Sequence, residues 1–443
     1  MDETGKKGMQ EQLQANSGWK KEIPIVLALI VALLPLFLPG PGIVVGETVT
    51  SRLATAHALI HHGVWYVDRP LEEEPNPFAD QTVDKVQRGD GHYLSSKPPI
   101  LPLLMAGDYG FFHKWRGWEL TDTDQLRSLL RFMIITLMKL PHMIGVICFA
   151  LLLRMFMSKG WHVAFLLLAL AYATPLTGYA LQINNHTPGT AAVLICLYFG
   201  IGLYTGKLKA TAWRFIAFGF ASAFTFVLDM PVTIFPAVLG LLLIARFPKQ
   251  SILWAGLGAA PLLLIHFSIM IATTGSPLPV QTQGSMYTFR DSYWRNPIGV
   301  DGLNEFWYVY LFHMTFGRFG IFLLFPITLL AIPGVWKKIT SPKDDLSLPY
   351  FALLAAFLII SAYYLVFTNN YGGAAYGFRW YNGAVPVLLL LSLPAVSRIN
   401  NWKVALLLLP FFAVSAWSAW ECYLAPWGAS HEWTCRLLFG PVF

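Results

Sequence analysis

Runs of apolar residues recur along the chain, and their lengths constrain its fold more than any other feature. An α-helix needs about 20 apolar residues to cross a bilayer, and many of these runs approach that length. Charged residues make up only 12% of the chain, about half of their share in an ordinary soluble domain. A water-soluble fold of this size is therefore excluded, and the strands of a β-barrel would be shorter and would alternate in polarity.

The sequence thus predicts an all-α polytopic membrane protein with about eleven transmembrane helices. The predicted spans cover residues 24–45, 132–156, 161–181, 188–204, 213–228, 231–245, 252–272, 319–335, 349–367, 384–396 and 404–420.

The distribution of basic residues predicts the orientation. With the N-terminus inside, the tail 1–23 and the inner connectors hold 16 of the 31 basic residues but only 6 of the 24 acidic ones. This is a positive-inside pattern, and it accounts for the net charge of +7 without a nucleic-acid partner. The run 24–45 is too long for a cleaved signal and is interpreted as a retained anchor. We expect an integral, multi-pass protein of a bacterial inner membrane, with an outer C-terminal tail at 421–443.

Residues 46–131 form one long outer loop, which joins the first span to the helical bundle predicted over 132–420. The loop opens with a helix-like stretch, 48–61, that ends at Gly63. The apolar segment 98–112 has two leading prolines and contains Asp108, so we interpret it as an interfacial helix. The polar chemistry of the chain is therefore expected at the outer face of the membrane.

The outer loop contains several candidate site residues. Glu47 follows the first span, where a carboxylate suits a general base or a metal ligand, although it also fits a simple helix start. Asp84 and Asp90 precede Lys97, which stands before Pro98-Pro99 at headgroup depth. An ammonium there suits a phosphate, and the alternative is a snorkelling membrane anchor.

Other candidates lie between the later spans. Asp229, flanked by apolar helices, suggests a cavity or a partner, or else a water-exposed turn; Lys139 has the same two interpretations. The segment 368–381 combines glycines and tyrosines with Arg379, which suits a bound sugar phosphate, whereas an aromatic belt is the alternative. His313 and Arg318 are placed where they would face the same cavity.

Histidines and cysteines indicate no metal centre. His57 and His61 share a helix face, but no third ligand follows at a recognisable spacing. His62, His92 and the glutamates at 72–74 do not complete a recognisable metal-binding pattern either. The four cysteines form no metal-thiolate motif. Cys422 and Cys435 lie outside in this topology, where an oxidising compartment would allow a disulfide that spacing alone does not establish.

The outer loop carries a resemblance to a known protein family. Glu47, the stretch SRLATAHALIHHGVWYVDRP and the stretch GHYLSSKPPILPLLMAGDYGFF resemble the first outer loop of the GT-C membrane glycosyltransferases. The loop is similar to that of lipid A aminoarabinose transferases, protein O-mannosyltransferases and uncharacterised bacterial members of the group. The chain departs from them twice: Gly46-Glu47 replaces the usual Asp-Glu pair, and Asn184-Asn185-His186 stands where a further Asp is common.

The resemblance implies a GT-C-like fold and a sugar transfer from a polyprenyl-phosphate donor to a hydroxyl or amine of a lipid, glycan or protein acceptor. Glu47, or failing that Asp84 or Asp229, would act as the base. No metal is required for this reaction, and a divalent ion is not excluded. A transporter or flippase and a catalytically inert GT-C relative are the alternatives. The expected substrate contacts are Arg52, Asp90, Lys97, Lys139, Asn185, His186, His313, Arg318, Tyr371, Tyr376 and Arg379.

Overall fold

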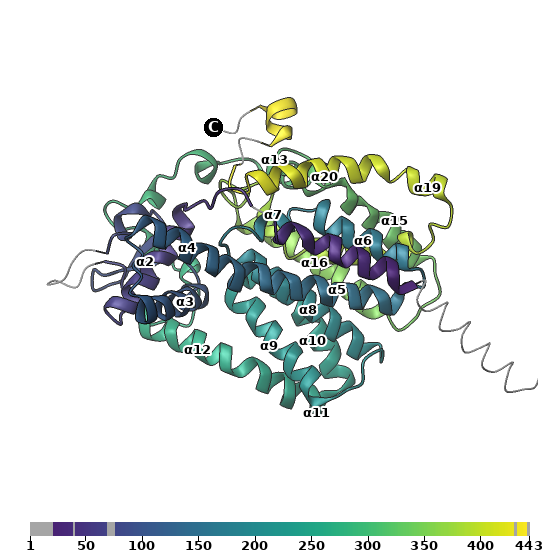
Figure 1. The fold of residues 1–443 in the computed structure, drawn as a ribbon, viewed down its shortest axis with the longest axis horizontal. Helices are drawn as coiled ribbons and strands as arrows, with labels where there is room; N and C mark the ends of the chain where they lie inside the picture. The colour runs from purple at the N-terminus through teal and green to yellow at the C-terminus, as the bar shows by residue number, and fades with distance from the viewer. Residues whose placement is uncertain (1–20, 39, 69–75, 429–431, 441–443) are drawn as a thin grey trace, which may run out of the picture.

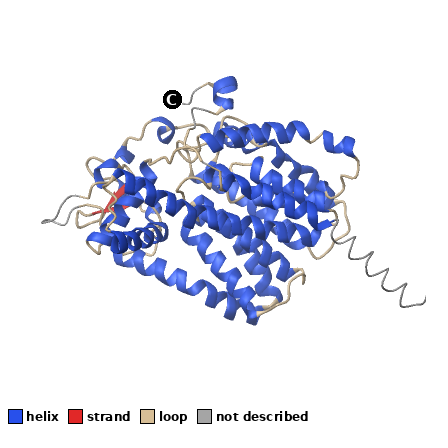
Figure 2. Ribbon diagram, viewed as in Figure 1, coloured by secondary structure: helices blue, strands red, loops and turns tan. Residues whose placement is uncertain are grey.

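The computed structural model describes residues 21–38, 40–68, 76–428 and 432–440. Figure 2 shows that this part of the chain is mostly helical, with one small pair of strands. Residues 21–33 are also helical and continue into a 3-10 turn at Leu34–Leu36. The α-helices that follow are α2 Glu47–His61, α3 Ile100–Arg116, α4 Thr123–Met133, α5 Leu140–Phe156, α6 Gly160–Tyr172, α7 Leu176–Tyr179, α8 His186–Tyr204, α9 Ala212–Leu228, α10 Ile234–Arg246, α11 Pro248–Gln250, α12 Gly256–Thr274, α13 Trp307–Thr315, α14 Ile321–Leu324, α15 Ala331–Ile339, α16 Ser347–Phe367, α17 Val385–Leu391, α18 Leu393–Val396, α19 Trp402–Leu406 and α20 Leu409–Leu424.

Helices α2, α3 and α4 gather at one end of the molecule (Figure 1), and we call them, with the strand pair, the outer-loop unit. The expected helix at 48–61 forms as α2, and its C-terminus is followed by Gly63 at a φ of 66°. The expected interfacial helix forms as α3, directly after Pro98-Pro99. Proline suits this place because the first N–H groups of a helix have no intrahelical partner. Apolar faces of α2 and α3 pack on each other and make a small core of their own.

The two strands are β1, Lys85–Gln87, and β2, Tyr93–Ser95, which pair in antiparallel register with Lys85 opposite Ser95. The ladder continues by one bond, from the Ser96 N–H to the Asp84 carbonyl oxygen at 3.0 Å. This register brings the residue before β1 and the residues after β2 to the same end of the hairpin. It therefore places Asp84 next to the segment that leads into α3.

The helical bundle is built around α8. This helix is almost wholly buried and packs against α5, α9 and α10, and α9 in turn packs against α12. Helices α12 and α20, by contrast, expose most of their apolar surface. Apolar side chains that face outward are expected where lipid is the solvent. The bundle therefore has the construction of a membrane protein.

Five helical segments are long and apolar enough to cross a membrane, and each overlaps a predicted span. They are Thr123–Phe156, His186–Tyr204, Pro248–Thr274, Ser347–Phe367 and Lys403–Leu424. Shorter apolar helices stand in four other predicted spans, namely Gly160–Tyr172, Ala212–Leu228, Met230–Arg246 and Val385–Val396. The predicted number of eleven spans is therefore not confirmed by helix length.

Two predicted spans are interrupted. The helix expected over 24–45 ends with the turn at Leu34–Leu36, because Pro35 and Pro41 lack the N–H groups that would continue it. The span expected over 319–335 is divided into α14, a 3-10 turn at Pro326–Leu330 and α15. Pro326 again stands at the break.

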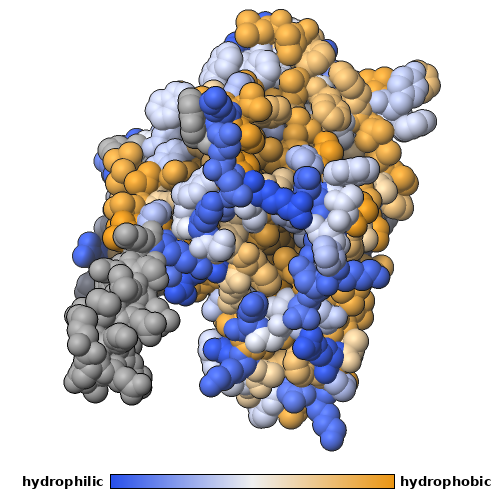
Figure 3. All heavy atoms as spheres, turned by 90° about the vertical axis from the view of Figure 1, so that its right-hand side faces the viewer, coloured by the Kyte–Doolittle hydropathy of each residue, from blue (hydrophilic) through white to orange (hydrophobic). Residues whose placement is uncertain are grey.

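The end of the bundle opposite the outer-loop unit is polar. Figure 3 views the molecule from this end and shows hydrophilic residues over much of the face. A cavity of about 300 Å³ lies between Lys21, Arg154, Tyr198 and Lys207. This polar end, together with the exposed apolar surface of α12 and α20, fits a protein that spans a membrane, and which side the end faces stays a prediction.

Candidate functional site

Three cations meet where the outer-loop unit joins the bundle, and we call Arg52, Lys97 and Arg379 the cation cluster. Arg52 comes from α2, Lys97 from the segment between β2 and α3, and Arg379 from the loop that follows α16. The cations lie close enough to interact electrostatically: besides burial, Arg52 and Arg379 both lower the pKa of Lys97, and Arg379 lowers that of Arg52. These residues are up to 327 positions apart in the sequence, and only the tertiary fold brings them together.

Lys97 forms an ion pair with Asp84, with 2.8 Å between Nζ and Oδ2. Asp84 is buried, and its carbonyl oxygen also accepts a hydrogen bond from Ser51 Oγ at 2.6 Å, which ties the hairpin to α2. Burial lowers the pKa of Lys97, and the nearby Asp84 carboxylate opposes that shift. The pair therefore holds an ammonium in a poorly solvated place.

Arg52 is only 2% exposed, although it is a charged side chain. It donates to the Thr48 carbonyl oxygen and to Asn185 Oδ1, both at 2.9 Å, so it links α2 to the start of α8. Its Nε has no hydrogen-bond partner. Burial lowers the pKa of Arg52 to about 10, opposed by Asp84. A buried cation of this kind costs free energy unless an anion joins it.

Arg379 lies against the glycine loop that precedes it. Gly372 and Gly373 have φ values of 90° and 78°, and a Cβ on Gly372 would come within 2.9 Å of Arg379 Cγ. The guanidinium lies 5.4 Å from the centre of the Trp427 ring, and its Nε has no partner. Burial lowers its pKa, opposed by Tyr179 and then by Asp84. Glycine is therefore needed here for both its conformation and the close contact.

A buried acid–imidazole pair adjoins the cluster. His186 Nδ1 lies 2.7 Å from Asp229 Oδ2, and both side chains are buried. Gly189 makes room for it, since a Cβ there would come within 3.0 Å of Asp229 Cβ. Asn185 donates from Nδ2 to the Leu228 carbonyl oxygen at 3.1 Å while it accepts from Arg52. The start of α8 and the end of α9 are thus joined directly to the cation cluster.

Glu47 occupies the first turn of α2, and its carboxylate is exposed. Oε2 accepts the backbone N–H of Val83 at 2.7 Å, so the carboxylate lies beside the hairpin segment that carries Asp84. The Trp294 indole N–H donates to the carbonyl oxygen of the same Val83 at 3.1 Å. Glu47 is therefore the solvent-facing acid of this junction, whereas Asp84 and Asp229 are buried and paired.

Comparison with known proteins bears on this fold. No family model and no curated protein matches the sequence. The structure is similar to that of the Archaeoglobus fulgidus oligosaccharyltransferase in its apo form, with a TM-score of 0.51 over 91% of this chain and 56% of the other, at 13% identity. It is equally similar to AglB from Archaeoglobus fulgidus, the archaeal oligosaccharyltransferase solved with an inhibitory peptide and a dolichol-phosphate. The TM-score is again 0.51, over 93% of this chain and 57% of the other, at 14% identity.

The chain has a GT-C fold. It spans little more than half the length of the solved structures that it matches. At this sequence identity the likeness concerns the fold, and it assigns no residue a role. The GT-C fold nevertheless agrees with the outer loop on which the sequence resemblance depends.

Within the GT-C fold, two predicted contacts lie away from the cation cluster. Lys139 donates from Nζ to the Leu36 carbonyl oxygen at 2.7 Å, where the first helix ends. Asp90 stands at the tip of the hairpin and pairs with Arg88 at 3.2 Å. Each has a structural partner in its own neighbourhood, so the structure does not bring these two residues together with the others.

The predicted aromatic and C-terminal candidates are also engaged elsewhere. The hydroxyl groups of Tyr371 and Tyr376 donate to Glu305 and Glu421, respectively. Tyr371 has a φ of 53°, which is rare for a residue other than glycine. We interpret both tyrosines as residues that shape the loop carrying Arg379.

His313 and Arg318 hold the C-terminal segment. His313 Nδ1 accepts the Arg318 N–H at 3.2 Å, and the Arg318 guanidinium donates to the Phe439 carbonyl oxygen at 2.9 Å. Cys422 and Cys435 are both buried free thiols, so the disulfide that the sequence left open is not formed in this structure. Sequence reasoning missed Asp301, which accepts from Asn370 at 2.7 Å beside the glycine loop, and no local pattern marks it.

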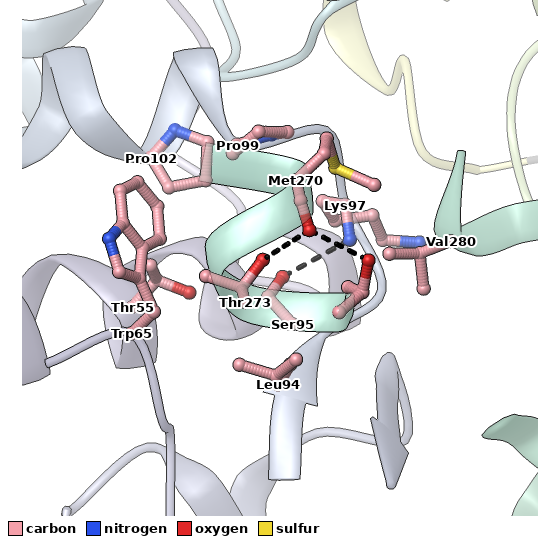
Figure 4. Close-up of a pocket in the computed structure, with 11 residues that line it drawn as sticks. Thr55, Trp65, Leu94, Ser95, Lys97, Pro99, Pro102, Met270, Thr273 and Val280 are labelled. Atoms are coloured by element: carbon pink, nitrogen blue, oxygen red, sulfur yellow. Dashed lines mark hydrogen bonds between the residues drawn. The ribbon is translucent and has the colours of Figure 1, made fainter. Parts of the chain in front are cut away.

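A small cavity of about 30 Å³ adjoins Lys97, between α2, the start of α3 and the end of α12 (Figure 4). Ser95 Oγ accepts the Lys97 N–H there at 3.2 Å. Apolar side chains such as Met270 and Val280 form much of the remaining wall. A cavity of this size holds about one water molecule, so a larger ligand would require the surrounding segments to separate.

Proposed function

We propose that this protein is a membrane glycosyltransferase that moves a sugar from a polyprenyl-phosphate donor to a hydroxyl or amine acceptor at the outer face of the membrane. The cation cluster is the observation that carries the proposal. Lys97 is paired with Asp84, whereas Arg52 and Arg379 have no ion pair among the described residues, and each keeps an unpartnered Nε. A lipid-borne phosphate is the anion that fits this place. One of the structures with the same fold was solved with dolichol-phosphate, which supports the choice of donor.

In the proposed reaction the lipid phosphate is the leaving group. The acceptor oxygen attacks the anomeric carbon, the bond from that carbon to the phosphate oxygen breaks, and its electron pair stays on the phosphate. Arg52, Lys97 and Arg379 would neutralise that developing charge, the arginines with paired N–H donors. A single displacement of this kind inverts the anomeric centre.

We propose that these cations suffice and that no metal is required for the transfer. Among the described residues, the one group of three metal-ligating side chains close enough to share an ion lies elsewhere. At the junction, Asp84 is already paired with Lys97 and Asp229 with His186. These contacts favour cationic over metal-assisted stabilisation of the phosphate.

Glu47 is our proposed general base. Its carboxylate is exposed, so it can take the proton that the acceptor releases, and the Val83 N–H fixes its orientation. Asp84 and Asp229 are then positioning residues, one for Lys97 and one for His186. The donor lipid would reach the cluster sideways from the membrane, between the outer-loop unit and the bundle.

A binding protein without turnover is the second candidate. Gly46 stands where GT-C relatives usually have an acidic residue, and Glu47 also fits an ordinary helix start. Such a protein, or a transporter of a lipid-linked anion, would use the same cation cluster without a base.

The test uses the purified full chain with radiolabelled polyprenyl-phosphate sugars and membrane extract. We expect transfer in the native protein and a loss of about 10²- to 10⁴-fold in Glu47→Gln, as is typical for removal of a general base. Arg127→Gln, an exposed cation on α4, is the matched control and should keep full activity. Donor binding without turnover in the native protein would favour the second candidate, and full activity in Glu47→Gln, Asp84→Asn and Asp229→Asn would contradict the mechanism.

A further inference from the structure

A second polar cluster lies at the C-terminal end of α2, about 14 Å from Arg52 along the helix axis. His61 comes from the last turn of α2 and His113 from the last turn of α3. Glu119 follows shortly after Gly117, whose φ of 65° ends α3 and turns the chain back. We call these three residues the histidine–glutamate cluster.

The cluster has the geometry of a set of metal ligands. His61 Nε2 lies 3.2 Å from Glu119 Oε2, and His113 Nδ1 lies 3.1 Å from Glu119 Oε1. One ligand atom from each of the three residues lies within 4.8 Å of the others. Bonds of 2.0 to 2.1 Å from a tetrahedral ion to nitrogen or oxygen place neighbouring ligand atoms roughly 3.3 Å apart. The observed separations therefore need only small adjustments to admit an ion.

His57 supplies a second, independent observation. Its side chain belongs to a residue that is only 9% exposed, and Nδ1 is buried without a hydrogen-bond partner. The ring stacks on that of His61, with 4.2 Å between the ring centres. A buried polar atom without a partner is rare in folded proteins. Its place beside the histidine–glutamate cluster is explained if a ligand belongs there.

Tyr109 completes the arrangement from α3. Its hydroxyl donates to Glu119 Oε2 at 2.8 Å and lies 2.7 Å from His61 Nε2. A hydrogen bond to a ligating carboxylate is the usual support for metal ligands. His113 Nδ1 also lies 3.2 Å from the Trp118 carbonyl oxygen, and metal binding through Nδ1 would replace that contact.

We propose that His61, His113 and Glu119 form a binding site for a divalent transition-metal ion, with Zn²⁺ as the best match. Two imidazoles and one carboxylate suit Zn²⁺, whereas Ca²⁺ and Mg²⁺ prefer oxygen ligands alone. The fourth position falls to water or, after a rotation of its side chain, to His57. The ion would join α2 to α3 and thereby fix the helix that carries Glu47 and Arg52. It would act as a structural clamp, separate from the chemistry at the cation cluster.

The experiment uses the full chain in detergent, stripped of metal with a chelator and then exchanged into chelator-free buffer. Bound zinc is measured after addition of Zn²⁺, and Co²⁺ serves as a spectroscopic probe, since tetrahedral Co²⁺ absorbs visible light. We expect one tightly bound Zn²⁺ per chain and a visible Co²⁺ band that Zn²⁺ displaces. Thermal unfolding should move to a higher midpoint with Zn²⁺, because an ion that binds only the folded chain stabilises it.

Glu119→Gln and His113→Asn should weaken Zn²⁺ binding by about 10-fold or more and remove the thermal shift. His92→Asn is the matched control, a histidine of the same outer loop that is bound to Asp68 instead. It should bind Zn²⁺ like the native chain. The absence of stoichiometric binding in the native chain would overturn the proposal, and so would equal binding in Glu119→Gln and His92→Asn. The native titration gives an answer even if a variant fails to fold.

Discussion

The cation cluster and a carboxylate cluster near the C-terminus both bury ionisable side chains, but they do so in opposite ways. The carboxylate cluster consists of Glu421 and Glu432, and its oxygens have partners. Glu432, wholly buried, accepts the Gly377 N–H and the Cys435 thiol. Glu421 accepts the Tyr376 hydroxyl and the Trp433 N–H at 3.0 Å each, and it pairs with Arg436.

In the cation cluster, by contrast, Arg52 and Arg379 each keep an unpartnered Nε, and neither has an ion pair among the described residues. A satisfied buried charge is explained by structure alone, whereas an unsatisfied one costs free energy that a ligand can offset. One loop serves both places, since Tyr376 and Gly377 belong to the first and Arg379 to the second. The difference distinguishes Tyr376 and Gly377, which stabilise the conformation of this loop, from Arg379, which the loop places in the cation cluster.

Arg379→Gln gives the largest effect expected from this comparison. The glutamine removes a charge that we propose stabilises the leaving phosphate, so transfer should fall by about 10²- to 10³-fold. The thermal midpoint should stay the same or rise slightly, because the native side chain buries a charge without a paired anion. The measurement is the initial transfer rate per folded chain, alongside a thermal unfolding curve. A stable loss of activity supports the comparison; full activity with a lower midpoint would make Arg379 a structural residue.

Much of the fold could be predicted because its signals are local. The helix-like stretch 48–61 and the Gly63 stop mark α2, and Lys97-Pro98-Pro99 marks the start of α3. Arg379 stood out because its glycine loop lies in the same short segment. The eleven spans were harder to predict, because prolines shorten or divide helices, and the length of an apolar run does not show where this happens.

The partners of the site residues could not be predicted, because they are distant in sequence. Nothing local joins Arg52 to Asn185, 133 positions away. The same holds for His61, whose proposed metal-binding partners lie on and just after a different helix: His113 in the last turn of α3, and Glu119 after it. Tyr371 and Tyr376 had the composition of ligand contacts, and only the structure assigns their hydroxyl groups to carboxylates.

Glu432→Ala tests the other side of the comparison and should act on stability alone. It leaves the Gly377 N–H buried without an acceptor, which costs about 1 to 3 kcal/mol of folding free energy. Burial raises the pKa of Glu432 well above its usual range, so Glu432→Gln, which keeps an acceptor oxygen, is the matched control and should lose less. Unfolding curves measure the cost, and the transfer rate per folded chain should not change. A large loss of rate in the glutamine variant would show that this cluster does more than support the loop.

Lys97→Arg tests the cation cluster through the pH dependence of transfer, and its expected effect is the smallest of the three. Burial lowers the pKa of Lys97 below its usual 10.5, opposed by Asp84. The ammonium therefore loses its proton at a lower pH than an exposed lysine would, and donor affinity should fall as the pH rises through that range. Arginine stays protonated there, so the alkaline limb of kcat/KM for the donor should move to higher pH, while the rate near neutral pH changes by less than about tenfold. Profiles of the native chain, Lys97→Arg and Arg127→Gln make the comparison. If the alkaline limb stays in place in Lys97→Arg, the charge on Lys97 does not bind the donor, and the cation cluster is reduced to its two arginines.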